Sequence, residues 1–336
     1  MLFTEIPGQS KALKLLGRAL ENARLAHAYL FIGPDGVGKV TAARALAAVI
    51  FCREKPGTAP CGTCPGCLKF SSGNHPDFLH IVPQGTTIKI DQVRELKKAL
   101  CFPSLESDHR VILLEDVHTM RREAANSLLK LLEEPPPGNI LLLTADESEP
   151  LLPTIISRCH VVPFFPLPLA LTAEIIQQRE PGLDNEEAAF LAFLTGGCPG
   201  MAESFDAQEL LGVRKEIIEN LLQEQTDPAG EVETALLLAS KTADFKEGLE
   251  PLLTLLRLFF KETMSALCTP APGKTGNHEL DLEVSRARER WNLDELSDKI
   301  RAIDYAEQAL VRNCNRGLVC EVLFLHLLHS KAQQQY

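Results

Sequence analysis

The sequence predicts an α/β domain built on a parallel sheet, followed by a region made only of helices. Three observations predict it. Short apolar runs alternate with helical patterns through the first 165 residues, which is typical of a parallel sheet covered by helices. A glycine-rich segment at 33–41 directly follows the first of these runs. Beyond the prolines of 163–168, apolar residues recur at helical spacing.

The elements of the first part follow from these patterns. We expect strands at the short, largely apolar runs 28–32, 79–82, 111–114 and 139–144. We expect helices at 11–26, at 39–50, after an N-cap at Asp91, and at 123–134, where a run of prolines ends the pattern. The cysteine-containing segment 52–67 carries proline and glycine, so we expect a loop there.

The second part shows no convincing strand. Its helical patterns cover 209–224, 230–241, 244–268, 293–312 and 316–331, after two or three shorter ones within 169–206. A proline- and glycine-rich span, 269–276, predicts an exposed loop.

Composition limits the functions of the chain. Its 336 residues carry a net charge of −11, which argues against a strong DNA binder acting alone, because phosphate contacts need lysine and arginine. The first residues resemble no signal peptide, and no apolar run reaches the ~18–20 residues of a membrane span. We therefore expect a cytoplasmic protein. In a reducing cytoplasm, clustered cysteines favour a metal site over disulfides.

Residues 33–39 match the first seven positions of the phosphate-binding pattern G-x-x-x-x-G-K-[ST], between an expected strand and an expected helix. Backbone N–H groups of such a loop hold phosphates, and the lysine adds a positive charge. The eighth position is Val40, which lacks the hydroxyl that binds Mg²⁺; Thr41 points elsewhere, because one helical residue rotates by about 100°. The candidate phosphate-site residues are Gly33, Gly36, Gly38, Lys39, Val40 and Thr41.

Two acidic residues, Glu115 and Asp116, end the expected strand 111–114. Many nucleotide hydrolases carry an Asp followed by a Glu at this place, to orient Mg²⁺ and water. Here the order is reversed, and catalysis tolerates displacements of ~1 Å badly. The alternative is that both acids simply lie at the surface.

Four cysteines, Cys52, Cys61, Cys64 and Cys67, have short spacings that suit tetrahedral, structural Zn²⁺. An iron–sulfur cluster and free thiols are the alternatives. His75 is close enough in sequence to replace Cys52 as a ligand, but we expect it on the surface.

Several strings together resemble the bacterial clamp-loader family of AAA+ proteins, which load the sliding clamp of DNA polymerase III. They are the phosphate loop, the four cysteines, the string 124–136 (AANSLLKLLEEPP) and the Ser-Arg-Cys string 157–159. The resemblance covers most of the first 200 residues. It implies an AAA+ domain over 1–165 with a zinc module at 52–67, a helical lid over 166–207, and a helical collar domain over 208–332.

Within that family, the resemblance separates ATP-hydrolysing motor subunits (gamma/tau) from a stator with a degenerate nucleotide site. Val40, the reversed acid pair and Met201, which stands where motors have an arginine that touches the γ-phosphate, favour the stator. Lys39 and Thr144, at the end of the strand 139–144, are retained, so ATP or ADP binding stays open while Mg²⁺ is disfavoured. A motor subunit is the alternative. A third, an unrelated AAA+ ATPase with a zinc knot, is opposed by the Ser-Arg-Cys string.

The resemblance also implies a mechanism and partners. Arg158 would reach the γ-phosphate of ATP on an adjacent motor, as an arginine finger; a salt bridge at a strand edge is the alternative. The implied partners are the gamma/tau and delta subunits, with the sliding clamp and primer-template DNA met through the complex. The chain would be part of the polymerase holoenzyme without being its polymerase, and its own ATP hydrolysis would be weak or absent.

Overall fold

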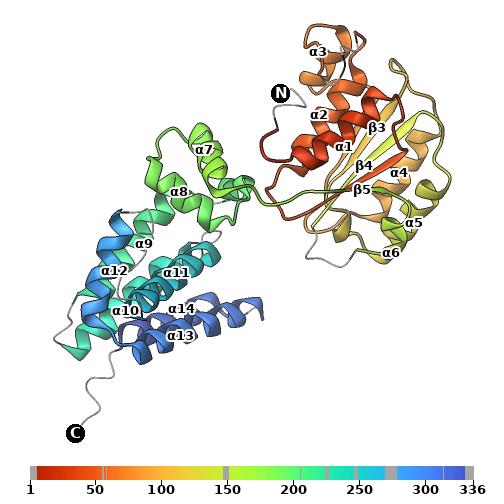
Figure 1. The fold of residues 1–336 in the computed structure, drawn as a ribbon. Coiled ribbons are helices and arrows are strands. Elements are labelled where there is room, and N and C mark those ends of the chain that lie inside the picture. The colour runs from red at the N-terminus through yellow and green to blue at the C-terminus, as the bar shows by residue number, and fades with distance from the viewer. Residues whose placement is uncertain are drawn as a thin grey trace. The chain divides into compact units, whose positions relative to one another are not determined.

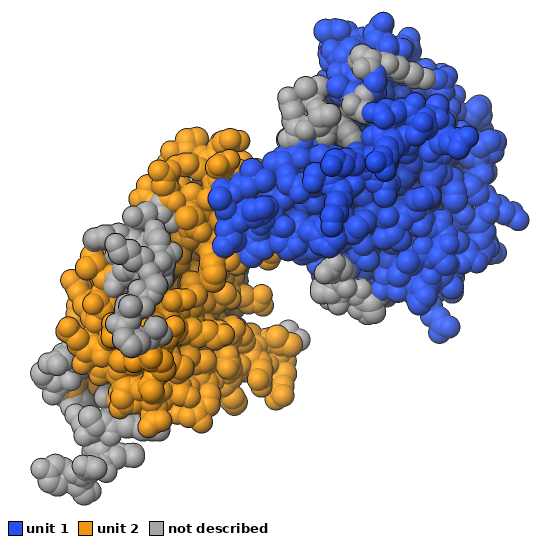
Figure 2. All heavy atoms as spheres, in the orientation of Figure 1, with its two compact units in different colours: residues 1–172, 196–200 blue, residues 173–195, 201–336 orange. Residues whose placement is uncertain are grey.

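The computed structural model describes residues 6–54, 57, 59–146, 151–204, 206–223, 227–245, 249–268, 278–312 and 314–329. The predicted loop 269–276 lies outside these residues. The chain forms two compact units (Figure 2), one of residues 1–172 with 196–200 and one of residues 173–195 with 201–336. The predicted domain bounds at 165 and 207 stay predictions.

A five-stranded, wholly parallel sheet forms the centre of the first unit (Figure 1). Its strand order is β2-β3-β4-β1-β5, so β4 lies between β1 and β3. The strands are β1 (Ala28–Ile32), β2 (Phe78–Ile81), β3 (Arg110–Leu114), β4 (Asn139–Ala145) and β5 (His160–Pro163). The predicted parallel sheet is confirmed. The sequence patterns missed β5, an edge strand that pairs only with β1 among the described strands.

Helices cover both faces of this sheet (Figure 1). Side chains alternate along each strand, so Val111 and Leu113 join one apolar core and Ile112 and Leu114 join the other. The first core contains α1 (Ser10–Glu21) and α2 (Lys39–Phe51), and the second contains α4 (Ile90–Leu100) and α5 (Arg122–Glu133). Three short helices, α3 (Pro65–Ser71), η2 (Val117–Thr119) and α6 (Pro153–Ile156), complete the unit.

Two local predictions were wrong. The helix α4 is capped by Lys89, whose backbone N–H donates to the Gln92 side chain at 2.9 Å, and not by Asp91. Asp91 lies in the first turn and pairs with Arg94 instead. The cysteine segment is also not all loop, because α3 begins at Pro65, a residue whose fixed φ suits a first helical turn.

The second unit is helical throughout the part that the structure describes, as predicted. One apolar core joins its helices, with Phe259, Phe260, Trp291 and Phe324 at its centre. The helices are α7 (Leu169–Arg179), which starts in the first unit, α8 (Asn185–Leu194), η3 (Pro199–Ser204), α9 (Ala207–Leu222), α10 (Pro228–Asp244), α11 (Leu249–Cys268), α12 (His278–Arg290), α13 (Leu293–Val311) and α14 (Arg316–Leu328). The patterns did not predict α12.

Candidate functional site

The glycine-rich loop connects β1 to α2, as the sequence predicted. Gly36 and Gly38 have φ values of 73° and 98°, a left-handed conformation that costs glycine little and other residues more. Gly33 has no room for a side chain, because a Cβ there would lie 2.4 Å from the carbonyl oxygen of Phe164. The loop therefore needs its glycines, and it delivers the chain to the N-terminus of α2, where free N–H groups favour anions.

Lys39 is the first residue of α2 and is 5% exposed. Its Nζ donates to the carbonyl oxygens of Gly33, at 2.7 Å, and Pro34, at 3.0 Å, and pairs with the Asp35 carboxylate at 2.8 Å. The ammonium is thus held over the loop by the loop's own acceptors. A bound phosphate would compete with Asp35 for this charge.

A second segment, 196–200, closes over the loop. The Gly200 N–H donates to the Gly36 carbonyl at 2.9 Å, and a Cβ on Gly200 would lie 2.7 Å from the Gly36 Cα. Cys198 is buried in the same core as Val37. Sequence reasoning noted this segment as a break between helical patterns and for Met201, which belongs to the second unit and is 44% exposed. The glycines themselves were the signal for close backbone approach.

The two residues after Lys39 differ in surroundings. Val40 is partly buried and packs against the apolar core of α1 and α2. Thr41 lines a pocket of about 390 Å³ between α2 and α3, with Arg44 and Phe70 among its other walls. Neither side chain supplies a hydroxyl to the loop, which agrees with the sequence argument about Mg²⁺.

The two acids point to different neighbours. The Glu115 carboxylate pairs with His80 Nε2 of β2 at 2.5 Å, and β2 is the strand farthest from β1. Asp116 has a left-handed backbone, with φ of 51°, and its N–H donates to the buried Thr144 hydroxyl at 3.0 Å. The charge of Asp116 interacts with Asp35 and Lys39 of the loop.

The pKa of Asp116 reflects its position beside the glycine-rich loop. Burial, and then the negative charge of Asp35, raise its pKa above the usual value, against the opposing effects of His118 and Lys39. Asp116 and Asp35 therefore carry excess negative charge beside the loop. Sequence reasoning missed Asp35, His80 and His118; the register of β2 on β3 brings His80 to this edge, whereas His118 follows the acid pair directly in η2.

Arg158 follows α6 and is partly exposed, with 34% of its side chain accessible to solvent. Its guanidinium pairs with Glu133 of α5 at 2.7 Å and donates to the Thr154 carbonyl at 3.0 Å. The surface salt bridge weighed as an alternative thus exists. It does not exclude a second role, because an exposed pair of this kind is worth little and is readily exchanged.

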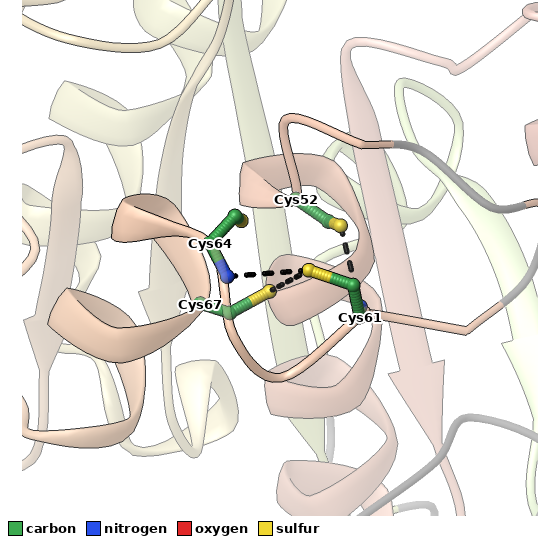
Figure 3. A group of neighbouring side chains, drawn as sticks. All are labelled: Cys52, Cys61, Cys64 and Cys67. Atoms are coloured by element: carbon green, nitrogen blue, oxygen red, sulfur yellow. Dashed lines mark hydrogen bonds between the residues drawn. The ribbon is translucent and has the colours of Figure 1, made fainter.

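The four predicted cysteines come together (Figure 3), with all their sulfurs within 4.8 Å of one another. Cys52 follows the end of α2, and Cys64 and Cys67 begin α3. Backbone N–H groups point at sulfur: Cys61 donates to Cys52 Sγ and Cys64 donates to Cys61 Sγ, both at 3.3 Å. Such N–H···S contacts stabilise thiolates.

The donor set fits a zinc ion. Tetrahedral Zn²⁺ with bonds of about 2.3 Å places its sulfurs about 3.8 Å apart, so the cluster needs to contract by about 1 Å at most. Backbone N–H groups of Thr63 and Cys64 lower the pKa of Cys61 to about 6, whereas burial raises that of Cys67 to about 12. A bound cation would deprotonate Cys67 as well.

His75 is not part of this cluster. It is 5% exposed, and its ring stacks on Phe51 with centroids 3.9 Å apart. The expectation that it lies on the surface was wrong. Asp77, two residues later in the sequence, is buried too.

Comparison with known proteins agrees with this geometry. A family model described as "DNA polymerase III, delta subunit" matches residues 8–168. The delta-prime subunit of DNA polymerase III from Bacillus subtilis is 38% identical over 211 residues, 62% of this chain and 63% of that protein. Over these residues the chain is similar to the clamp-loader subunits of DNA polymerase III.

Both branches of the clamp-loader family are represented among the relatives. The delta-prime subunit of Pseudomonas aeruginosa is 36% identical over 59% of this chain and 61% of its own length. The gamma/tau subunit of Mycobacterium tuberculosis is 35% identical over 59% of this chain and 35% of its own length. The chain thus spans about three fifths of the delta-prime relatives that it matches.

Among solved structures, a DNA polymerase III gamma-subunit-related protein from Thermotoga maritima aligns over 95% of this chain and 98% of its own, at 19% identity and a TM-score of 0.43. In the described part of this chain, no helix has both the length and the apolar character needed to cross a membrane.

Proposed function

We propose that this chain is the delta-prime-type stator of a clamp loader, which completes the ATP site of a neighbouring motor subunit through Arg158. Its partners would be gamma/tau and delta subunits, and through them the sliding clamp and primer-template DNA. The observation that carries the proposal is the loop itself. It keeps Lys39 and its glycines but offers Mg²⁺ no hydroxyl from Val40 or Thr41.

The arrangement of the acids supports weak or absent ATP hydrolysis by this chain. Hydrolysis in related nucleotide sites needs a carboxylate that orients Mg²⁺ and one that positions water. Here Glu115 is paired with His80, and Asp116 interacts with the loop charges of Asp35 and Lys39. ATP or ADP binding remains compatible with the loop, whereas metal-assisted cleavage lacks its ligands.

The position of Arg158 supports a role toward another subunit. The side chain is partly exposed, and its contacts are to α5 and α6 of its own unit. A guanidinium in this place can exchange Glu133 for a phosphate group of a neighbouring chain, because its planar fork suits either acceptor. Arginine fingers of this kind contribute ~10³–10⁵ in rate.

The second unit supports assembly with other subunits. Its helices α10 and α14 lie side by side and expose several large apolar side chains: Val232, Leu236, Leu237, Leu318 and Val322. A groove of about 740 Å³ runs along α13 and α14, with Tyr305 and Leu318 among its walls. Exposed apolar surface of this extent is typical of protein–protein contacts.

The test is ATP turnover by the purified chain alone and by a reconstituted loader. We expect no turnover by the chain alone. In the loader, Arg158→Ala should slow hydrolysis at the neighbouring motor site by ~10³-fold or more, without preventing assembly as measured by size-exclusion chromatography. Arg94→Ala is the matched control, since Arg94 is also an exposed arginine that pairs with an acid in the same unit.

Two outcomes would contradict the proposal, each in a different part. Robust hydrolysis by the isolated chain would favour the alternative, a gamma/tau-like motor, which the retained Lys39 and Thr144 support. Unchanged loader activity with Arg158→Ala would remove the arginine finger while leaving the non-hydrolysing loop in place.

A further inference from the structure

The cysteine cluster is connected by a continuous chain of contacts to an exposed apolar loop on the same unit, residues 101–109. We propose that metal bound at the cluster holds this loop in one conformation, so that the cluster controls a surface as well as the local fold. The proposal does not depend on the proposed function. It depends on the fit of the four cysteines to a metal and on the contacts described next.

The first step runs from the cluster to His75. Phe51, the residue before Cys52, stacks on the His75 ring with centroids 3.9 Å apart and planes 20° apart. The carbonyl of Phe51 also lies so close to Gly66 that a Cβ there would approach it to 2.2 Å. The end of α2 and the start of α3 are therefore packed backbone to backbone between the metal ligands Cys52 and Cys67.

The second step runs from His75 to the loop. His75 Nδ1 accepts the Asp77 N–H at 3.3 Å, so the neutral ring carries its proton on Nε2 and donates to the Ser107 hydroxyl at 3.3 Å. Burial lowers the pKa of His75, which agrees with this neutral form. The ring is thus fixed on one face by Phe51 and at both nitrogens by polar partners.

The third step is the buried carboxylate of Asp77, which is 0% exposed. It accepts the backbone N–H groups of Leu105 at 2.6 Å, Glu106 at 2.8 Å and Ser107 at 2.9 Å. Burial alone would raise the pKa of Asp77, but the three N–H donors outweigh it and the pKa is lowered. Three charge-assisted bonds to consecutive residues fix the backbone of this part of the loop.

Ion pairs add a direct link to the cluster. Glu106 pairs with Lys69 of α3 at 2.6 Å and lies 3.8 Å from Arg53, the residue after Cys52. On the other side, the buried Arg110 donates to the carbonyl oxygens of Ala99, Phe102 and Pro103 at 2.6–3.0 Å. Arg110 anchors the start of the loop to the sheet, whereas Asp77 and Glu106 anchor its middle to the zinc module.

The loop so held displays two large apolar side chains, Phe102 and Leu105, which are 69% and 73% exposed. Exposed side chains of this size are normally mobile, and ordering them costs conformational entropy. Here the hydrogen bonds and ion pairs of Asp77, Glu106 and Arg110 fix the backbone that carries them. Loss of the metal would free α3 and the end of α2, loosen the His75 and Glu106 contacts, and release the middle of the loop while Arg110 still holds its start.

The experiment is hydrogen exchange on the full chain, followed residue by residue at Leu105, Glu106 and Ser107, with and without metal removed by a strong chelator. We expect exchange at these amides to rise ~10-fold or more, equivalent to ~1.4 kcal/mol of local stability. The amides of β4 and of α11 serve as internal controls and should change little. Cys64→Ser should reproduce the effect, and Cys268→Ser, which changes an exposed cysteine of the second unit, should not.

Asp77→Asn tests the coupling from the other end. It removes the charge that holds the loop but leaves the four cysteines, so metal should remain at one equivalent while loop exchange rises. Because coupling between two sites is reciprocal, the same variant should let a competing chelator remove the metal more readily, by a similar factor. Unchanged exchange at 105–107 after metal removal would overturn the proposal, and so would an equal loss of protection in β4, which would show general unfolding.

Discussion

The two ends of α2 each lead into a candidate binding site, and the two sites differ in how many of the needed ligands this chain supplies. At its N-terminus, α2 carries Lys39 and the glycine loop; at its C-terminus it passes directly into Cys52 and the cysteine cluster. The cluster holds all four ligands within 4.8 Å in a single chain. The loop holds a phosphate cradle, yet its surroundings supply neither the hydroxyl nor a free pair of acids that Mg²⁺-assisted hydrolysis needs.

This difference shows which function each end can perform alone. Four cysteines supply a full ligand set for a tetrahedral metal ion such as zinc, so the cluster needs no ligand from elsewhere. A cradle without metal ligands can at most hold a nucleotide. On the proposed function, such a chain would contribute to catalysis only beside another subunit, through Arg158.

The largest effect is expected at the cluster. Cys64→Ser should release one equivalent of metal and lower the free energy of unfolding of the first unit by roughly 3 kcal/mol or more. Metal binding contributes more than this to small zinc domains, but here the sheet has a core of its own. Metal analysis and denaturant unfolding measure the two quantities.

The matched control is Cys101→Ser, because Cys101 is an exposed cysteine of the same unit. It should keep the metal and change the unfolding free energy by less than ~0.5 kcal/mol. Full metal content in Cys64→Ser would show that the cluster is not the four-ligand site described above.

The next effect concerns the segment that closes over the phosphate loop. Gly200→Ala should cost about 1–3 kcal/mol, because its Cβ would lie 2.7 Å from the Gly36 Cα, and it should weaken nucleotide binding in a titration. Gly212→Ala, in α9 with nothing within 4 Å of the added Cβ, should instead stabilise by about 0.5–1 kcal/mol. Equal effects of the two changes would mean that the close approach at Gly36 is not a constraint.

Val40→Thr restores the missing hydroxyl at the loop. We expect ATP binding to become dependent on Mg²⁺, by about 10-fold or ~1.4 kcal/mol, as measured by calorimetry with and without the ion. Thr41→Val is the control and should change nothing at the loop, since Thr41 lines the pocket beside α3. No gain from Val40→Thr would place the deficiency in the acids instead.

Much of this contrast could be read from the sequence, because both sites are local. The four cysteines span only residues 52–67, and the loop is a contiguous motif between a strand and a helix. Four of the five strands followed from apolar runs. The edge strand β5 was missed because Val161 and Val162 are its only apolar residues before the proline, and α12 because polar and charged residues outnumber the apolar ones along it.

The parts that sequence did not predict depend on contacts between distant residues. The burial of His75 follows from Phe51 and Ser107, and the pairing of Glu115 with His80 follows from the register of β2 on β3. Local propensity contains no information on either contact. The capping of α4 by Lys89 was missed because Gln92, and not an acid or hydroxyl at the cap itself, satisfies the first N–H.

The smallest effect is expected at the ion pair between His80 and Glu115. His80→Gln should change the free energy of unfolding by no more than ~0.5 kcal/mol, because both side chains are partly exposed and such pairs are worth little. Combined with Val40→Thr, however, it should add about 3-fold to the Mg²⁺-dependence of ATP binding by freeing Glu115, an interaction that a double-mutant cycle isolates. If His80→Gln alone cost several kcal/mol, the pair would be a structural element. The loop end of α2 would then be built for stability as fully as the cluster end, and the contrast between them would fail.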